Sequence, residues 1–268
     1  MPIEVKGTIR VLDQQQFGEI AFEVMKAEFD VHDDLGRFLA EGAYQNELAQ
    51  LLGSRADTGV WIRVRHGDFC KVYVTDLVVD QGALFELKAV ESLQDEHRAQ
   101  LLNYLLLMGL KHGKLINFRP ERVEHEFVNT TLTREIRTRF EVDDSGWDRA
   151  VDRGHDIRSL VVELLREWGT GLDLQLYEEA VTFFLGGPER VIREIDIVSK
   201  GRKIGRQPVR LADSESVFKI TSLHRDLERF ESHARKFLEH TALQRILWIN
   251  VNLHKVTCKT ISKADLEK

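Results

Sequence analysis

Cysteine and proline are both scarce in this chain. Of 268 residues, 2 are cysteine (Cys70 and Cys258) and 4 are proline. Two cysteines supply neither a disulfide framework nor a metal-binding spacing, which predicts a reduced, cytoplasmic setting. With 43% hydrophobic residues, the composition excludes a disordered chain and leaves room for cores in two domains.

Long hydrophobic runs are absent as well. The most apolar stretch, Leu101–Leu110, is interrupted by Asn103 and Tyr104, and it is shorter than the roughly 20 residues that cross a bilayer. The first ten residues lack the charged and then apolar pattern of a signal peptide. We therefore expect no membrane partner.

Several familiar motifs and an excess of positive charge are missing too. Gly186-Gly187-Pro188 is not followed by the Gly-Lys-Ser/Thr of a phosphate-binding loop, and there is neither a Cys/His zinc cluster nor a serine nucleophile elbow. Lys and Arg number 38 against 44 Asp and Glu, a net charge of −6. Because nucleic acids are bound by clustered Lys and Arg, only a local basic groove could hold one.

The apolar periodicity of the first half predicts an α/β domain. Two helices, three strands, one helix and two strands follow in that order, which implies a mixed sheet. The first helix is expected to break at residues 33–36 (DDLG), and the second to end at Gly53. The predicted helices are Phe17–Phe29, Ala40–Leu52 and Glu96–Leu110, and the predicted strands are Val60–Arg65, Cys70–Val79, Ala83–Val90, Lys114–Phe118 and Glu124–Thr131.

The second half repeats this plan at a constant distance of 133 residues. The matching pairs are Tyr44 and Tyr177, Phe85 and Phe218, and Ile116-Asn117 and Ile249-Asn250. One offset kept through helices and strands predicts an internal duplication, with domains 1–140 and 141–268 and a linker near Val142–Trp147. The alternative is chance similarity between two α/β domains.

Three charged residues on neighbouring predicted strands form the strongest chemical signal. Alternation along a strand sends Glu86 and Lys88 to one face, and Asp76 lies near them across the hairpin. Two carboxylates and an amine are costly to bury without a partner, and Mg²⁺ takes oxygen ligands from one or two carboxylates and a substrate phosphate. The alternative is a solvated strand face with an ordinary Glu–Lys ion pair, and spacing alone leaves both interpretations open.

The surrounding segments resemble a known nuclease family. Asp76 followed by Glu86-Leu87-Lys88 is similar to the PD-(D/E)XK nuclease motif, and five segments in order resemble its GxxExxY branch over about residues 15–130. These segments are residues 31–36 (VHDDLG), 39–44 (LAEGAY), 85–91 (FELKAVE), 99–104 (AQLLNY) and 115–118 (LINF). Phe38 departs from the branch, because it stands where the first Gly of the motif belongs, two residues after Gly36.

The resemblance implies a fold and a set of roles. The fold would be α/β, with two tandem restriction-endonuclease-like domains, each a mixed sheet flanked by helices. Asp76 and Glu86 would be ligands of Mg²⁺ or Mn²⁺, and Lys88 the catalytic lysine. Glu41 would be an extra acidic residue, and Gln100 would contact phosphate or the attacking water.

Three other polar residues have two interpretations each. Tyr44 is either packed core with a satisfied hydroxyl or a catalyst. His97 is either a solvated residue at a helix start or a second contact beside Gln100. His32 is expected to be structural rather than functional.

The second copy lacks this chemistry. At the 133-residue offset no proposed metal ligand is kept, so this copy is expected to be catalytically inactive. The replacements are Asp76 by Val209, Glu86 by Lys219, Lys88 by Thr221, Glu41 by Leu174 and Gln100 by His233. The copy could replace the partner of an ancestral homodimer, which leaves a pseudo-twofold monomer and a homodimer both open.

The most basic stretch of the chain falls in the second half. Lys200, Arg202, Lys203 and Arg206 lie in a predicted strand hairpin and could position a nucleic-acid backbone. The alternative is a solvated edge hairpin that charge protects from pairing.

Two functions follow from these patterns. The first is a Mg²⁺-dependent phosphodiesterase that cleaves DNA or RNA with metal-activated water. The second is a non-catalytic nucleic-acid-binding or scaffold protein that kept a nuclease fold, since a fold alone does not establish activity.

Overall fold

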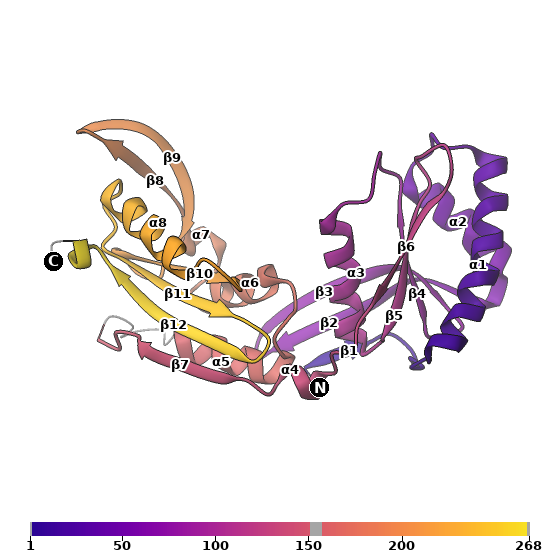
Figure 1. The fold of residues 1–268 in the computed structure, drawn as a ribbon, viewed down its shortest axis with the longest axis horizontal. Coiled ribbons are helices and arrows are strands. Elements are labelled where there is room, and N and C mark those ends of the chain that lie inside the picture. The colour runs from indigo at the N-terminus through magenta and orange to yellow at the C-terminus, as the bar shows by residue number, and fades with distance from the viewer. Residues whose placement is uncertain (1, 151–156, 267–268) are drawn as a thin grey trace. The chain divides into compact units, whose positions relative to one another are not determined.

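The computed structural model describes residues 2–150 and 157–266. The chain divides into two compact units, residues 1–136 and 137–268. Each unit combines helices with a mixed sheet (Figure 1), so the predicted α/β class is confirmed. Within the described ranges, every helix is too short or too polar to serve as a membrane span.

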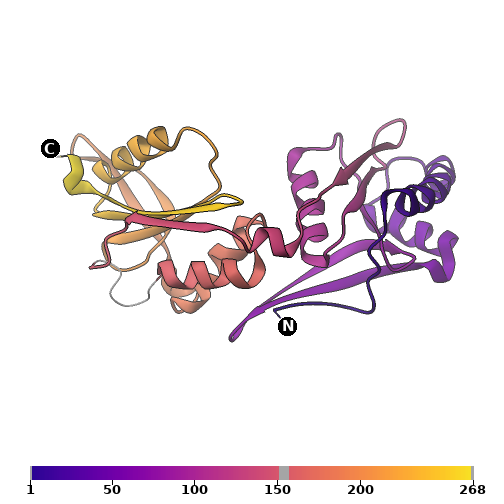
Figure 2. The ribbon, with the colours of Figure 1, turned by 60° about the horizontal axis from the view of Figure 1, so that its bottom comes forward.

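Unit 1 is a six-stranded sheet with helices on both faces (Figures 1 and 2). The strands lie in the order β1-β2-β3-β4-β5-β6, and all neighbours are antiparallel except β4 and β5, which are parallel. Figure 2 shows the long β2–β3 hairpin extending beyond the rest of this sheet. The elements are β1 (Ile3–Val5), α1 (Gln14–Leu35), α2 (Glu41–Leu52), the short 3₁₀ helix η1 (Gly53–Arg55), β2 (Ala56–His66), β3 (Phe69–Val79), β4 (Ala83–Lys88), α3 (Asp95–Met108), β5 (His112–Asn117) and β6 (Glu124–Asn129).

The two faces of this sheet are covered differently. On one face α1 and α2 bury an apolar core against β3, β4 and β5, in which Phe17 stacks on Phe85 with ring centroids 6.0 Å apart. On the other face α3 approaches β5 closely at Gly113, where a Cβ atom would lie 3.0 Å from Leu101 Cδ1. A side chain at position 113 would require the ends of the Leu101 and Leu105 side chains to shift by a few tenths of an ångström, so glycine permits this close packing.

The helices of unit 1 largely follow the prediction, with one correction. α2 begins after Ala40 and ends at Gly53, as expected. α1 is longer than predicted, because Asp13 and Gln16 form a capping box at its start and the helix continues to Leu35. The predicted break at 33–36 is therefore confined to Gly36, whose φ of 67° closes the helix while its N–H donates to His32 O.

Unit 2 contains a four-stranded mixed sheet and a separate two-stranded hairpin. The order is β10-β11-β12-β7, with β10–β11 and β12–β7 parallel and β11–β12 antiparallel. The elements are α4 (Arg134–Arg137), which spans the division between the units, β7 (Glu141–Gly146), α5 (Ile157–Trp168), α6 (Leu174–Phe184), α7 (Pro188–Val191), β8 (Ile192–Ser199), β9 (Arg202–Arg210), β10 (Ser216–Thr221), α8 (Leu227–Glu239), β11 (Arg245–Val251), β12 (Lys255–Ser262) and the 3₁₀ helix η2 (Lys263–Leu266).

The linker predicted at Val142–Trp147 is wrong. Residues 141–146 form β7, which pairs with β12 across a register shift, and Trp147 is buried. Asp143 and its neighbours are poor strand formers. Pairing succeeds here because β7 is an edge strand, and Asp143 Oδ2 lies 3.1 Å from Lys255 Nζ on β12.

Candidate active site

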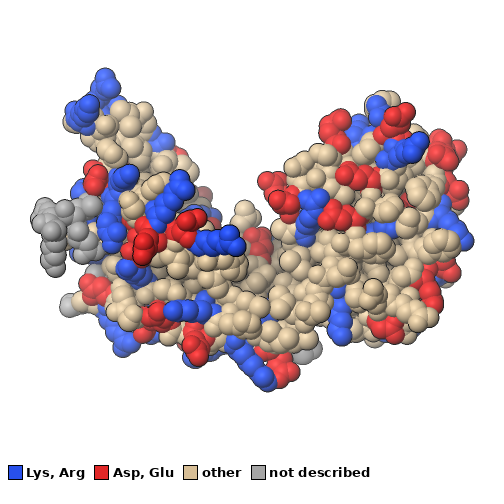
Figure 3. All heavy atoms as spheres, viewed as in Figure 1, with Lys and Arg blue, Asp and Glu red and all other residues tan. Residues whose placement is uncertain are grey.

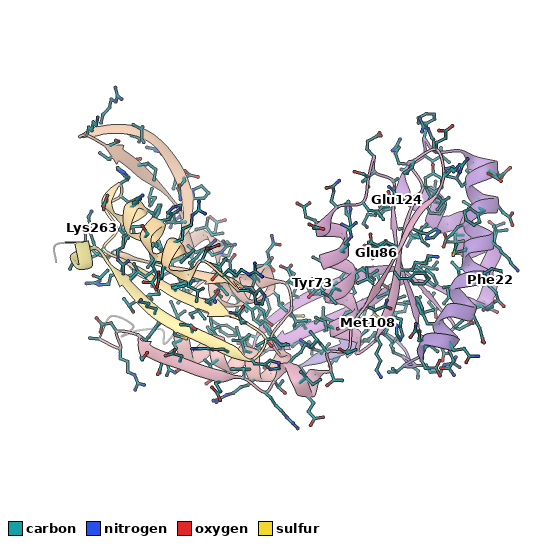
Figure 4. The ribbon with its side chains drawn as sticks, in the orientation of Figure 1. Phe22, Tyr73, Glu86, Met108, Glu124 and Lys263 are labelled. Atoms are coloured by element: carbon teal, nitrogen blue, oxygen red, sulfur yellow. The ribbon has the colours of Figure 1, made fainter. Side chains whose placement is uncertain are left out.

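Four charged side chains converge beside β3 and β4. Leu77 pairs with Phe85 in the antiparallel register, which sets Asp76 beside Glu86. Lys88 Nζ lies 2.8 Å from Glu86 Oε1 and 3.8 Å from Asp76 Oδ2. It also lies 3.9 Å from Glu41 Oε2, which comes from the first turn of α2. The structure thus brings the three strand residues and Glu41 together, and Figure 4 marks Glu86 among the strands beside α3.

Hydrogen bonds to the backbone hold this cluster in place. Asp76 Oδ2 accepts from Leu87 N at 2.8 Å, and Lys88 Nζ donates to Leu87 O at 2.8 Å. Glu86 is 1% exposed, and its Oε2 has no donor among the residues that the structure describes. A buried carboxylate oxygen without a donor is costly, so the site is arranged for something other than stability alone.

Burial controls the protonation of the cluster. Desolvation, reinforced by the charge of Asp76, raises the pKa of Glu86 from 4.5 to about 8, although Lys88 opposes the shift. Desolvation also raises the pKa of Asp76 and of Glu41. Burial by itself would lower the pKa of Lys88, but the neighbouring carboxylates outweigh it and raise that pKa overall. An amine thus held as a cation among raised carboxylates is typical of a functional site.

The donor set of this cluster fits a hard divalent cation. In the described part of the chain no group of three or more His, Cys, Asp or Glu side chains is arranged to hold a metal ion. Mg²⁺ does not require one, because it is usually bound by one or two carboxylates together with waters and substrate phosphate. Asp76 and Glu86 offer that pair, and the Glu86 Oε2 atom without a donor is the group that a cation would satisfy.

Comparison with known proteins agrees with this geometry. Residues 18–130 match the family model of the PD-(D/E)XK nuclease superfamily. The matched region runs from α1 to the end of β6 and contains the whole cluster. No curated protein and no solved structure matches the chain.

Two residues that the sequence analysis did not single out support the cluster in the matched region. Gln45 lies one turn after Glu41 on α2, and its Nε2 donates to Asp76 O at 2.6 Å. Tyr104 is buried on α3, where its pKa is raised by desolvation and also by Glu86 and Asp76. Both residues could have been found from the sequence. Gln45 lies four residues after Glu41, and Tyr104 lies four residues after Gln100, and residues four apart share a helix face.

Gln100 lies next to this arrangement rather than against the carboxylates. Its Nε2 donates to the Tyr104 hydroxyl at 3.1 Å. Gln100 thus orients the hydroxyl whose pKa the acidic cluster raises, and its predicted contact to phosphate or water stays a prediction.

Tyr44 is a packed core residue with a satisfied hydroxyl, which was the first of its two interpretations. It is fully buried, and its ring stacks on Phe118 with centroids 4.5 Å apart. Its hydroxyl donates to Gly36 O at 2.9 Å and accepts from Leu39 N at 3.1 Å. These two bonds fix the loop that precedes Glu41.

The two histidines have structural roles. His97 Nδ1 accepts from Gln94 N at 2.9 Å and so caps the start of α3. His32 Nε2 lies 3.1 Å from Pro120 O, which ties α1 to the loop after β5.

Removing the Tyr44 hydroxyl is expected to release the loop before Glu41. Tyr44→Phe keeps the ring stack but leaves Gly36 O and Leu39 N without their partner, at a cost of about 1 kcal/mol in the stability of unit 1. Faster hydrogen exchange at the Leu39 amide is the local measurement. Tyr177→Phe is the matched control, because Tyr177 donates to Gly169 O in unit 2. Unchanged Leu39 exchange in Tyr44→Phe would contradict this role.

The basic residues predicted to hold nucleic acid lie on the β8–β9 hairpin of unit 2. Figure 3 shows Lys and Arg in blue at its free end. Lys203 Nζ and Arg206 Nε lie 2.6 and 3.0 Å from Asp196 Oδ1. Lys200 and Arg202 form no ion pair within the described ranges, and Lys203 and Arg206 share the single charge of Asp196, so most of this positive charge is not neutralised inside the hairpin.

Proposed function

We propose that unit 1 is a metal-dependent phosphodiesterase that cleaves nucleic acid with metal-activated water. The observation that carries the proposal is the convergence of Asp76, Glu86 and Lys88 within 3.8 Å of the lysine amine. This convergence lies inside the region that matches a nuclease superfamily. Nucleic acid, DNA or RNA, is the substrate that this superfamily implies.

Each residue of the cluster has a distinct part in this proposal. Asp76 and Glu86 would hold Mg²⁺ or Mn²⁺, which when bound lowers the pKa of a water and offsets phosphate charge. Lys88 is aimed by its bonds to Glu86 and to the Leu87 carbonyl, so its amine can orient the attacking water and stabilise the charged phosphate. Glu41 adds a third carboxylate from the start of α2.

Metal-dependent cleavage tests the proposal directly. The full chain is incubated with labelled single- and double-stranded DNA and RNA in Mg²⁺, in Mn²⁺ and in EDTA. Cleavage in either metal that stops in EDTA is expected. Binding without turnover in all three conditions would overturn the proposal and favour the non-catalytic nucleic-acid-binding function.

We assign the matched region more narrowly to the GxxExxY branch. Glu41 lies beside Lys88, and Tyr44 fixes the preceding loop, which supports a joint role for these motif positions. Phe38 departs from the motif and is 75% exposed. The positive φ that the loop requires is supplied by Gly36 instead.

Unit 2 is, in this proposal, a duplicated copy of unit 1. The parallel pairing of Leu84 with Gly113 recurs 133 residues later as Val217 with Ile246. A side-chain clamp recurs as well: Asn117 bonds both backbone groups of Val90, and Asn250 bonds both backbone groups of Leu223. If the two α/β domains were similar by chance, nothing would place the same strand register and the same asparagine clamp at one constant offset, so these features favour duplication.

The second copy is catalytically degenerate in this proposal. Where unit 1 has Glu86 and Lys88, unit 2 has Lys219 and Thr221, and Thr221 Oγ1 donates to Asn250 Oδ1 at 2.7 Å. Val209 replaces Asp76. A cation and an alkyl group cannot replace two carboxylates as ligands of a hard metal.

A further inference from the structure

Unit 2 contains a cavity whose lining includes Val209, Lys219 and His233, which lie 133 residues after Asp76, Glu86 and Gln100 of unit 1. Its volume is about 320 Å³, and it lies among β9, β10 and α8, with Glu178 of α6 and Ile246 of β11 completing the wall. This volume is at the lower end for small-ligand sites, so one small molecule or one residue of a polymer would fill it.

The charge of this cavity is reversed relative to the cluster of unit 1. Arg210 Nη1 lies 3.2 Å from Glu178 Oε2, and Lys219 Nζ lies 3.9 Å from Glu178 Oε1. Two cations therefore share one carboxylate. The cavity therefore has a spare positive charge, which favours an anion.

The other wall of the cavity is aromatic. Phe230 lines it and stacks on Trp248, with ring centroids 4.5 Å apart and planes at 29°. Trp248 is 1% exposed and is itself fixed, because its Nε1 donates to Thr221 Oγ1 at 2.8 Å. The Phe230 ring is therefore held in place from behind, and Phe237 lines the cavity about two helical turns farther along α8.

We propose that this cavity binds a nucleotide. The phosphate would lie at Arg210 and Lys219, and the base would lie against Phe230. A phosphate joined to a flat aromatic group matches an anion-binding corner next to an aromatic wall, which is how many proteins hold unpaired nucleotides. The site does not depend on cleavage by unit 1.

The nucleotide has two conceivable sources, a free mononucleotide or a single strand. β9 extends from the basic residues of the hairpin tip, Arg202 and Lys203, to the cavity wall at Arg210. A strand could follow this side, because Lys and Arg along one strand track a phosphate backbone.

Binding is measured on the full chain in EDTA. The calorimetric probes are AMP, adenosine, inorganic phosphate and a ten-residue oligothymidylate. The ¹H–¹⁵N signals of the four tryptophan indoles give a local readout, because Trp248 stacks on Phe230 of the aromatic wall. AMP is expected to bind one site and shift one indole signal, more tightly than adenosine or phosphate. If oligothymidylate displaces AMP the ligand is a strand, and if it does not the ligand is a free nucleotide.

Two matched pairs of variants test the assignment. Lys219→Gln should weaken AMP binding about fivefold, whereas Lys236→Gln removes the same charge from an exposed position on α8 and should not. Phe230→Leu should weaken it about fivefold or more, whereas Phe184→Leu outside the cavity should not.

Several outcomes would overturn the proposal. These are no binding of AMP or oligothymidylate at millimolar concentration, binding that shifts no indole signal, and equal weakening by a variant and its control. Failure of the cleavage test with AMP binding intact would overturn the nuclease proposal for unit 1 and leave this site standing.

Discussion

Asp76→Asn is expected to reduce metal-dependent cleavage by roughly 10³-fold, because the metal supplies several kcal/mol of charge stabilisation in reactions of this class. The substitution is a mild one for the fold. An asparagine Oδ1 can still accept the Leu87 N–H that Asp76 Oδ2 accepts at 2.8 Å. What is lost is one of the two carboxylate charges on the metal-binding face, so the fall should appear as loss of activity without loss of structure.

A matched substitution separates the effect of losing a carboxylate at the site from the effect of losing one elsewhere in the same sheet. Asp57→Asn changes the same chemical group at an exposed position on β2, in the same sheet, and should leave cleavage unchanged. Mn²⁺ binding, followed by water-proton relaxation, should weaken in Asp76→Asn and not in Asp57→Asn. Activity in Asp76→Asn within tenfold of the parent chain would remove Asp76 from the proposed chemistry.

The local geometry of the cluster was predictable because it depends on short-range rules. Strand alternation alone sends Glu86 and Lys88 to one face, and a short hairpin brings Asp76 opposite them. The end of α2 at Gly53 and the core position of Tyr44 follow from similarly local preferences.

What the sequence analysis missed depends on contacts between distant segments. β1 is only three residues long and exists because β2 offers it an edge. The sequence predicts a linker at β7 because Asp143 and its neighbours disfavour strands, but the pairing with β12 overrides that preference. Tyr104 could be placed on a helix, but its proximity to Asp76 arises from the packing of α3 on the sheet.

The same limit applies to Glu28 on α1. The buried stripe of this helix passes through Val24, Glu28 and Val31, so a carboxylate occupies a position at apolar spacing. A carboxylate in such a stripe is ordinarily excluded by the cost of desolvation. Its burial was not visible from hydrophobic spacing, because that spacing identifies apolar positions only.

Glu28 and Lys114 form a buried and incompletely compensated pair. Both side chains are 0% exposed, and neither Glu28 oxygen nor Lys114 Nζ has a hydrogen-bond partner in the ranges described. Lys114 Nζ lies 4.8 Å from the centre of the Phe127 ring. Desolvation raises the pKa of Glu28 from 4.5 to about 7, with Lys114 opposing, and desolvation lowers the pKa of Lys114, with Glu28 opposing.

This pair predicts that unit 1 loses stability as the pH rises from about 4.5 to 7. In that interval the unfolded chain releases a proton from Glu28 that the folded chain retains. The free energy of unfolding therefore falls by about 1.4 kcal/mol per pH unit, on the order of 3 kcal/mol in all. The contribution is fully present below 4.5 and is lost once the pH passes the folded-state pKa.

Glu28→Gln should remove the part of the decline that Glu28 contributes and leave the part that comes from Glu86, Asp76 and Glu41. Lys114→Met should extend the Glu28 part to higher pH, because Lys114 opposes the shift of Glu28. The effect is measured by urea unfolding at a series of pH values. Pulse proteolysis monitors the unfolding, and the peptides released from unit 1 report on that unit alone. Glu19→Gln on the exposed side of α1 is the control, and subtracting its profile cancels the other carboxylates. Parallel profiles for Glu28→Gln and Glu19→Gln would mean that Glu28 is ionised in the folded chain throughout this range, and that Lys114 compensates its charge in full.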